Sequence, residues 1–331
     1  MRQQPKKWLI TGVAGFIGSN LLEFLLLHDQ EVVGLDNFST GFQCNLDDVA
    51  QNVGAKRFSN FTFIEGDIAD LTTCREACDG VEIVLHQAAL GSVPRSIEDP
   101  IASNRSNVTG FLNILYAATQ QKVKRFIYAS SSSVYGDSKE LPKVEEHTGS
   151  LLSPYAVTKS VNELYANVFY KTYALETIGL RYFNVFGKRQ DPNGAYAAVI
   201  PKWIEALYNA KEVSIYGDGE TSRDFSYIAN IVQANVLAAV TDNKNAFGNI
   251  MNIAAGGRTT LKELFLLIQE QMLKQHLIQY PVEPLYQDFR QGDIRHSNAD
   301  ISKAHELLGF IPTHSLTEGM SETLQWYGHH L

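Results

Sequence analysis

Cysteine is scarce in this 331-residue chain, which has three of them, Cys44, Cys74 and Cys78. An odd number cannot pair completely within one chain, so the sequence is unlike a disulfide-stabilised secreted scaffold. Cys74 and Cys78 lie four residues apart on a predicted helix, but no second pair offers the remaining ligands of a zinc site. We therefore expect buried, reduced thiols in a cytoplasmic protein, and no metal site.

Long hydrophobic runs and an excess of positive charge are also absent. The apolar stretch 21–27 is interrupted by Glu23 and followed by two polar residues, which indicates a core helix and no membrane span. The apolar run after Lys7 is too short for a signal peptide. With 28 Lys and Arg against 36 Asp and Glu, the net charge is −8. The sequence has no basic stripe, so a nucleic-acid partner is not predicted. Hydrophobic residues make up 44% of the chain, enough for a large globular core.

Three glycines, Gly12, Gly15 and Gly18, stand between a short apolar run that ends at Thr11 and a helical pattern. In a strand–turn–helix unit, the first glycine permits the tight turn, the second lets the backbone approach a pyrophosphate, and the third allows helix and strand to pack closely. The N-terminus of the helix then faces the phosphates. This spacing predicts a dinucleotide site; the alternative is an ordinary strand-to-helix turn.

An acidic residue at the end of the next predicted strand, Glu31–Leu35, strengthens the dinucleotide interpretation. Asp36 lies eighteen residues beyond Gly18, where a carboxylate accepts hydrogen bonds from the adenosine ribose. Asn37 follows it, and no arginine is present there to receive a 2′-phosphate. The sequence therefore favours NAD over NADP.

Strands and helices alternate through the first half of the chain. The predicted strands are Trp8–Thr11, Glu31–Leu35, Phe61–Glu65, Val81–His86, Arg125–Ala129 and Thr177–Tyr182. Helices are predicted after Gly18, near Leu71–Cys78, near Ser103–Gln121, and from Pro154 to about Thr172. This alternation predicts an α/β protein with a doubly wound parallel sheet. We expect residues 1–184, rejoined by about 225–255, to form the dinucleotide domain, and 185–224 with 256–331 to form a smaller substrate-binding lobe over the carboxyl edge of the sheet.

Tyr155 and Lys159 lie four residues apart at the start of a predicted helix, so they share one face. Four serines, Ser130 to Ser133, follow the preceding strand. A tyrosine with a pKa of about 10 is a poor base at neutral pH, but a nearby ammonium lowers that pKa. The pair is therefore a candidate acid–base site, with a serine hydroxyl to pass the proton and the lysine also holding a ribose. The alternative is a solvated helix face.

These motifs together resemble the extended short-chain dehydrogenases/reductases, and within them the nucleotide-sugar 4-epimerases, from about residue 6 to the C-terminus. The matching segments are the glycine loop, Asp67-Ile68, Ser130–Gly136, Tyr155-x-x-x-Lys159 and Arg181–Gly187. The resemblance implies a Rossmann-type fold and catalysis by Tyr155, Lys159 and Ser131, with Ser132 as an alternative to Ser131. It implies further NAD contacts from Phe16, Ile17, Asn37, Ser39, Asp67, Ile68, Gln87, Ala88, Ala89, Asn107 and Tyr182.

The same resemblance implies a UDP-sugar site. Asn184, Arg223 and Arg290 match the residues that bind the diphosphate, Tyr216 matches the residue that stacks on uracil, and Asp293 matches one that contacts the ribose. The remaining implied substrate contacts are Ser92, Arg95, Ser131, Ser133, Ala198, Val199 and Ser297.

Ser297 stands where galactose-only epimerases carry tyrosine, so a 2-acetamido group should fit. We expect a UDP-N-acetylglucosamine 4-epimerase. Segment 90–96 resembles a loop of epimerases acting on UDP-N-acetylglucosamine or its uronic acid. Arg95 could therefore bind the C6 carboxylate of the uronic acid, which would be the alternative substrate. The other interpretation of Arg95 is a solvated loop arginine. Ser132-Ser133 replaces the Asp-Glu pair of sugar dehydratases, which disfavours a 4,6-dehydratase or reductase. A regulator with a dead site is disfavoured because Tyr155 and Lys159 are both present.

The resemblance also implies a homodimer. The helices near Ser103–Gln121 and Pro154–Thr172 match those that pair across the family's dimer as a four-helix bundle. Two ordinary sheet-covering helices are the alternative.

Overall fold

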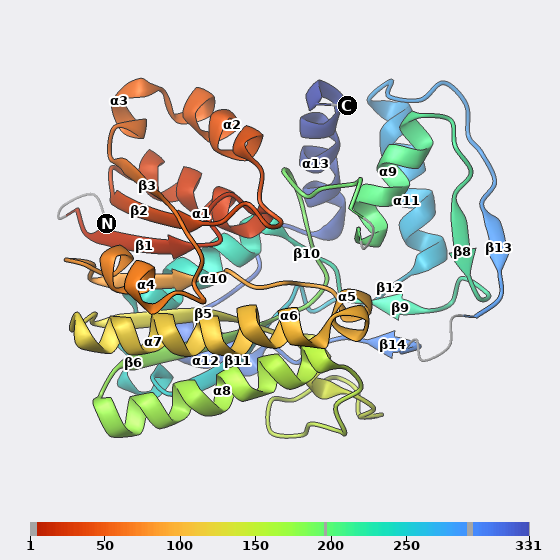
Figure 1. Ribbon diagram of the computed structural model, residues 1–331. Coiled ribbons are helices and arrows are strands. Elements are labelled where there is room, and N and C mark those ends of the chain that lie inside the picture. Colours follow the sequence, from red (N-terminus) through yellow and green to blue (C-terminus); the bar gives the residue numbers. More distant parts are fainter. Residues whose placement is uncertain (1–4, 195–196, 290–293, 331) are drawn as a thin grey trace.

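Short runs rich in Val, Ile and Leu form one seven-stranded parallel sheet with helices on both faces (Figure 1). The computed structural model describes residues 5–194, 197–289 and 294–330. In spatial order the strands are β3 (Phe61–Glu65), β2 (Glu31–Asp36), β1 (Lys7–Thr11), β4 (Ile83–His86), β5 (Arg125–Ser131), β6 (Glu176–Tyr182) and β11 (Asn249–Ile253). The order reverses between β1 and β4, which is where doubly wound sheets bind ligands. The predicted Rossmann-type fold is confirmed.

The sheet is buried on both sides because alternate residues of each strand enter different cores. The covering helices are α1 (Phe16–Leu27), α4 (Leu71–Ala77), α7 (Phe111–Gln120), α8 (Pro154–Tyr173) and α10 (Ile228–Val240). Trp8 and Ile10 of β1 pack with α1 and α10, whereas Leu9 packs with α4, α7 and α8. The alternation follows from the two-residue period of a strand. Helices on both faces leave the carboxyl edge of the sheet as the place for a site.

The predicted helix near Ser103–Gln121 is interrupted. It consists of α6 (Pro100–Asn104), a π-helical turn (Arg105–Gly110) and α7. Asn107 in that turn accepts a hydrogen bond from the backbone N–H of Leu90 at 2.7 Å and donates one to the Leu90 carbonyl at 3.1 Å. Such a turn often marks a functional position, and here it brings Asn107 to the loop after β4.

The other described elements complete the first half and build the C-terminal region. They are α2 (Gln43–Val53), α3 (Ala55–Phe58), α5 (Val93–Glu98), a 3₁₀ turn (Ser132–Tyr135), β7 (Val185–Phe186), α9 (Val199–Tyr208), β8 (Ser214–Tyr216), β9 (Ser222–Arg223), β10 (Ser226–Tyr227), a 3₁₀ turn (Lys244–Ala246), β12 (Thr259–Thr260), α11 (Leu261–Lys274), β13 (Leu285–Gln287), β14 (His296–Ser297), α12 (Ser302–Leu308) and α13 (Leu316–His330). The short strands form three small sheets, β10–β7, β12–β9–β14 and β13–β8. In Figure 1, α9, α11, β8 and β13 stand together beside the large sheet. The division into two lobes at the expected boundaries remains a prediction.

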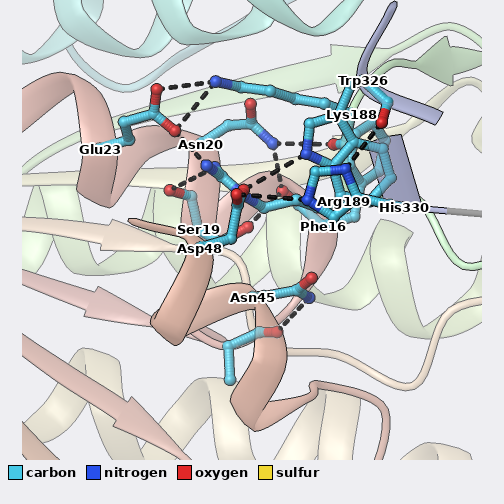
Figure 2. Close-up of polar contacts among 11 residues, drawn as sticks. Phe16, Ser19, Asn20, Glu23, Asn45, Asp48, Lys188, Arg189, Trp326 and His330 are labelled. Atoms are coloured by element: carbon cyan, nitrogen blue, oxygen red, sulfur yellow. Dashed lines mark hydrogen bonds and ion pairs between the residues drawn. The ribbon is translucent and has the colours of Figure 1, made fainter. Parts of the chain in front are cut away.

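A buried polar cluster joins the loop after β7 to α1, α2 and α13 (Figure 2). The Arg189 side chain is fully buried, pairs with Asp48 at 2.6 Å and also pairs with Glu23. Lys188 pairs with Glu23 at 2.7 Å, and the Trp326 indole N–H donates to Asp48 at 3.3 Å. Buried charges are tolerated when they are paired in this way. This Arg189 cluster fixes the chain just before residues 190–198.

Cys74 and Cys78 are buried free thiols, but Cys44 is exposed. The expectation of buried thiols is therefore wrong for Cys44, which lies on the outer face of α2. Among the described residues, none of the helices combines the length and the apolar character that crossing a bilayer requires.

Candidate functional site

A cleft of about 630 Å³ opens at the carboxyl edge of the sheet, where the strand order reverses. Of the predicted cofactor contacts, those that line it are Gly12, Gly15, Phe16, Ile17, Gly18, Asp36, Asn37, Ser39, Asp67, Ile68, Gln87, Ala88 and Ala89. Of the predicted substrate contacts, Ser92, Arg95 and Ala198 line the same cleft. The end of β2 and the loops that follow β1, β3 and β4 thus meet in one place, as the parallel order requires.

The glycine loop leaves no room for side chains at two of its positions. Gly12 has a φ of +70°, and a Cβ there would lie 2.8 Å from the backbone nitrogen of Ala88. A Cβ on Gly18 would lie 2.0 Å from the carbonyl oxygen of Gly12. Gly15, whose nearest such contact is 3.2 Å, is the N-cap of α1, and the first turn of α1 contains no acidic residue. A helix N-terminus open to the cleft suits a pyrophosphate.

Asp36 ends β2 and is 8% exposed. One carboxylate oxygen accepts a hydrogen bond from the Ala14 backbone N–H and the other from the Phe38 N–H, both at 2.9 Å. Burial raises the pKa of Asp36, and these backbone donors oppose that effect. The carboxylate is therefore held in one orientation, with lone pairs left to accept from a ribose hydroxyl.

The outer end of the cleft contains an ion pair that sequence reasoning missed. Arg105, in the π-helical turn, lies 3.5 Å from the Asp67 carboxylate, whose other oxygen accepts from the Ala69 N–H at 2.8 Å. The Asn37 side chain is also fixed by a local hydrogen bond, since its oxygen accepts from the Ser39 hydroxyl at 2.7 Å. No motif marks Arg105, because its place in the cleft depends on the interrupted helix.

Behind the cleft, two buried polar side chains have structural partners. The His86 ring lies 2.9 Å from the Thr11 hydroxyl, and burial, with a further contribution from the Lys159 charge, lowers the pKa of His86 to about 3. A neutral, buried imidazole supports a structural role. Asn107, 1% exposed, donates to the Thr158 hydroxyl at 3.2 Å, and so connects the Leu90 loop to α8.

The start of α8 places the candidate base. Ser153 is its N-cap and accepts from the Ala156 N–H at 3.2 Å, and Pro154 follows at the first helical position. The Tyr155 backbone N–H donates to the Ser96 hydroxyl at 3.0 Å. This capping fixes where α8 begins and therefore which residues face β5.

Tyr155, Ser131 and Lys159 meet at the carboxyl end of β5. Burial raises the pKa of Tyr155, while a hydrogen bond with the Ser131 hydroxyl opposes that rise. The Lys159 ammonium donates to the Ala129 carbonyl at 2.8 Å and lies 5.9 Å from the centre of the Tyr155 ring. Burial lowers the pKa of Lys159 to about 8, with the Glu163 carboxylate opposing that effect. The geometry thus joins a phenol, a hydroxyl relay and a cation.

Two other serines of the cluster, Ser132 and Ser133, begin the 3₁₀ turn after β5. The Ser133 backbone N–H donates to the Ser131 hydroxyl oxygen at 3.1 Å. Within the described part of the chain, the buried Ser133 hydroxyl finds no hydrogen-bond partner. A buried hydroxyl in that state is available to a ligand. Ser132 is half-buried at the first position of the turn.

Tyr182 belongs to a buried amide network that sequence reasoning found in part. Its hydroxyl accepts from the Asn235 amide at 2.8 Å and donates to the Gln87 side chain at 3.3 Å, while Gln87 donates to Asn235 at 3.1 Å. Burial raises the pKa of Tyr182 to about 12. The Tyr182 side chain is therefore neutral and held in one position beside Gln87. Asn235 was missed because it lies in α10, far along the chain.

Asn184, after β6, has a φ of 34°, and its amide donates to the Asp224 carbonyl at 2.9 Å. Burial raises the pKa of Asp224 to about 6, and its carboxylate accepts from the Ala255 N–H at 3.1 Å. Asp224 thereby ties the loop after β11 to the strand that carries Arg223. Val199 begins α9 directly after Ala198.

Arg223 and Ser297 lie side by side, because β9 pairs with β14 in that register. Two further arginines were missed. Arg258 lies 3.1 Å from the His296 ring, and Arg295 donates to the Asp218 carboxylate at 2.5 Å. A group of cations suits a diphosphate. Tyr216, in β8, pairs with Gln287 of β13. Arg290 and Asp293, two predicted substrate contacts, lie outside the described residues.

No metal-binding group of three or more His, Cys, Asp or Glu residues is found among the described residues. The expectation that the chain holds no metal remains a prediction.

The chain is similar to proteins of known kind over nearly its whole length. The NAD dependent epimerase/dehydratase family matches residues 8–254. A putative UDP-glucose 4-epimerase from Methanocaldococcus jannaschii is 35% identical over 96% of this chain and 97% of its own length. A UDP-N-acetylglucosamine 4-epimerase from Methanobrevibacter ruminantium, in complex with UDP-N-acetylmuramic acid, is 36% identical with a TM-score of 0.89, over 99% of this chain and 100% of that one. The UDP-glucose 4-epimerase of Thermotoga maritima, with UDP-glucose, is 35% identical with a TM-score of 0.87, over 98% and 99%.

Proposed function

The chain belongs to the NAD dependent epimerase/dehydratase family, and we propose that it is a 4-epimerase interconverting UDP-N-acetylglucosamine and UDP-N-acetylgalactosamine. NAD is the cofactor of this family and of this chain. The observation that carries the proposal is the meeting of Tyr155, Ser131 and Lys159 at the carboxyl end of β5, on the sheet edge that also forms the cleft.

The cleft suits a dinucleotide. The N-terminus of α1 would receive the pyrophosphate, since Gly12 and Gly18 tolerate no side chain and Gly15 opens to the cleft. Asp36 would accept from the adenosine ribose. Lys159 would hold the nicotinamide ribose. The chemistry that NAD supplies when bound is reversible acceptance of a hydride from C4 of the sugar.

Tyr155 would accept the 4-hydroxyl proton, with the Ser131 hydroxyl steadying the oxygen that loses it. The Tyr155 pKa is raised by burial, not lowered as the sequence predicts, and the hydrogen bond with Ser131 opposes that rise. The nearby Lys159 ammonium would favour the phenolate form that takes up the proton. The flat 4-keto sugar must then turn over, so that the hydride returns to the opposite face. Asn184 and Arg223 would bind the diphosphate. The sugar ring itself would make few contacts with them and so could rotate.

The N-acetyl preference is supported by Ser297. Ser297 pairs with Arg223 in the register of β14 and β9. The resemblance to galactose-only epimerases, which carry tyrosine at this position, implies that the short serine leaves room for a 2-acetamido group. A 36% identical structural relative is itself a UDP-N-acetylglucosamine 4-epimerase.

The test is to incubate purified protein with UDP-N-acetylglucosamine, UDP-N-acetylgalactosamine, UDP-glucose and the corresponding uronic acids, adding no cofactor, and to quantify the epimers. We expect the two N-acetylhexosamines to interconvert without added NAD. Turnover of UDP-glucose alone would contradict the proposed preference. An absence of any epimer, with NAD present in the purified protein, would contradict the function.

UDP-N-acetylglucosaminuronic acid is the second candidate substrate, because Arg95 lines the cleft from the first turn of α5. A guanidinium there suits a C6 carboxylate. Direct competition between the neutral and acidic sugars separates the two.

We also propose a homodimer. Val157, Leu164 and Val168 form an exposed stripe on α8, with Leu164 66% exposed, and Ile101 of α6 is 78% exposed. Apolar side chains at this helical spacing favour packing against a second copy as a helical bundle. Light scattering should give twice the chain mass, and Leu164→Asp should give the monomer.

A further inference from the structure

Three consecutive residues at the end of β5 contact three residues on one face of α8. Ser131 interacts with Tyr155, the Ala129 carbonyl accepts from Lys159 at 2.8 Å, and the Ser130 hydroxyl donates to Glu163 at 2.5 Å. The three α8 residues are spaced by four, so they succeed one another by about one helical turn. The third contact, between Ser130 and Glu163, lies outside the group of Tyr155, Ser131 and Lys159 that would carry out the chemistry.

Glu163 is held rigidly. Arg181 of β6 donates to both of its carboxylate oxygens at 2.8 Å, and Ser130 donates to one of them. The side chains of Glu163 and Arg181 are 9% and 5% exposed. The Arg181 guanidinium also donates to the Glu145 carbonyl at 3.0 Å and lies 4.9 Å from the Tyr135 ring centre. A carboxylate with these partners cannot rotate away from α8.

We propose that Glu163 is a positioning residue of the acid–base site: its clamped carboxylate, one turn beyond Lys159, keeps the Lys159 ammonium charged beside Tyr155. This inference rests on the proposed function, because it concerns the same tyrosine and lysine. Glu163 does not touch the reacting atoms; it acts through Lys159.

Glu163 is the carboxylate that acts on the Lys159 charge in the described part of the chain. Among the described titratable groups, Tyr155 and Glu163 on α8 and His86 on β4 interact with Lys159. Tyr128 on β5 and Tyr135 on the 3₁₀ turn interact with the ion pair between Glu163 and Arg181 of β6. His86 is neutral, because its pKa is lowered to about 3, and burial raises the pKa values of Tyr128 and Tyr135. Arg181 is the cation that pairs with Glu163 and so offsets part of its negative charge. Glu163 supports the Lys159 charge, since it raises the Lys159 pKa against burial.

The experiment measures the pH profile of kcat and, independently of turnover, the titration of Lys159 by NMR of protein carrying ¹³C-labelled lysine, assigned with Lys159→Met. In the native chain, the Lys159 ammonium should deprotonate near pH 8. The NMR titration and the pH profile of kcat should both have a midpoint there. In Glu163→Gln, both midpoints should fall by about one pH unit. Glu163→Asp keeps the carboxylate and should stay near the native midpoints.

A matched control lies on the same two strands. Arg125 of β5 pairs with Glu176 of β6 at 2.7 Å, at the opposite edge of the sheet from Tyr155. Glu176→Gln should lower the melting temperature and leave both midpoints unchanged. A Glu163→Gln protein that loses stability with unchanged midpoints, as the control does, would overturn the inference.

If Glu163→Gln does not fold, Arg181→Gln replaces it. That change removes the cation and keeps the carboxylate, so the Lys159 midpoint should rise; an unchanged or lower midpoint contradicts the inference. The NMR titration needs no substrate. If the native chain forms no epimer, the proposed function fails while the titration still decides the role of Glu163.

Discussion

The two halves of the site are built in different ways. The cofactor half is shaped mainly by backbone: a glycine loop with no room for a Cβ at Gly12 or Gly18, a helix N-terminus, and an Asp36 carboxylate fixed by two backbone donors. The sugar-nucleotide half consists of side chains on two-residue strands and loops, such as Arg223 and Ser297. Backbone geometry serves every substrate alike. Changes in the first half should therefore lower all activities together, and changes in the second should alter their ratios.

The largest effect is expected where the halves meet. Tyr155→Phe removes the group that accepts the proton and keeps the ring, so turnover of every UDP-sugar should fall by about 10³-fold or more. Co-purified NAD, measured after denaturation, should remain, because the glycine loop and Asp36, which line the cleft, are unchanged. Unchanged epimer formation would refute the assigned base.

Gly18→Ala tests the backbone half. Its Cβ would lie 2.0 Å from the Gly12 carbonyl oxygen, so α1 must shift away from the loop. We expect several kcal/mol of lost stability and little retained NAD. Gly257→Ala is the matched control, since no atom lies within 4 Å of its added Cβ. Equal melting temperatures and equal NAD contents in the two variants would contradict this account of the loop.

The same contrast explains how much the sequence could predict. The parallel sheet class, the Tyr155 helix and the glycine loop follow from local patterns, since a strand, a turn and a helix are neighbours in the chain. The predicted positions that line the cleft are mostly of this kind. Arg105, Asn235 and Arg258 were missed, because an interrupted helix or a pairing between distant loops brings them to the site. Arg258, for example, reaches His296 from 38 residues away. The thiol prediction failed at Cys44 for a related reason: a cysteine's residue type does not reveal which face of α2 it occupies.

Ser297→Tyr should act on the sugar half alone. A phenol beside Arg223 would occupy the space of the 2-acetamido group, so N-acetylhexosamine turnover should fall by about 10²-fold. Turnover of UDP-glucose and UDP-galactose should persist or rise, and the NAD content should match the native chain. A uniform loss across all four sugars would show that Ser297 does not set the preference.

Arg95→Ala gives the smallest expected effect, and it separates the two candidate substrates. Arg95 lines the cleft on α5, and the first turn of that helix is fixed by the Ser92 cap, whose hydroxyl oxygen accepts from the Arg95 N–H at 3.3 Å. If the guanidinium binds a C6 carboxylate, the KM for the uronic acid should rise by about tenfold, since a charge-assisted hydrogen bond contributes about 1.5–3 kcal/mol. The KM for UDP-N-acetylglucosamine should change little, because its C6 hydroxyl carries no charge. Equal effects on both substrates would mean that Arg95 contacts the part of the ligand that the two sugars share, and that it does not discriminate between them.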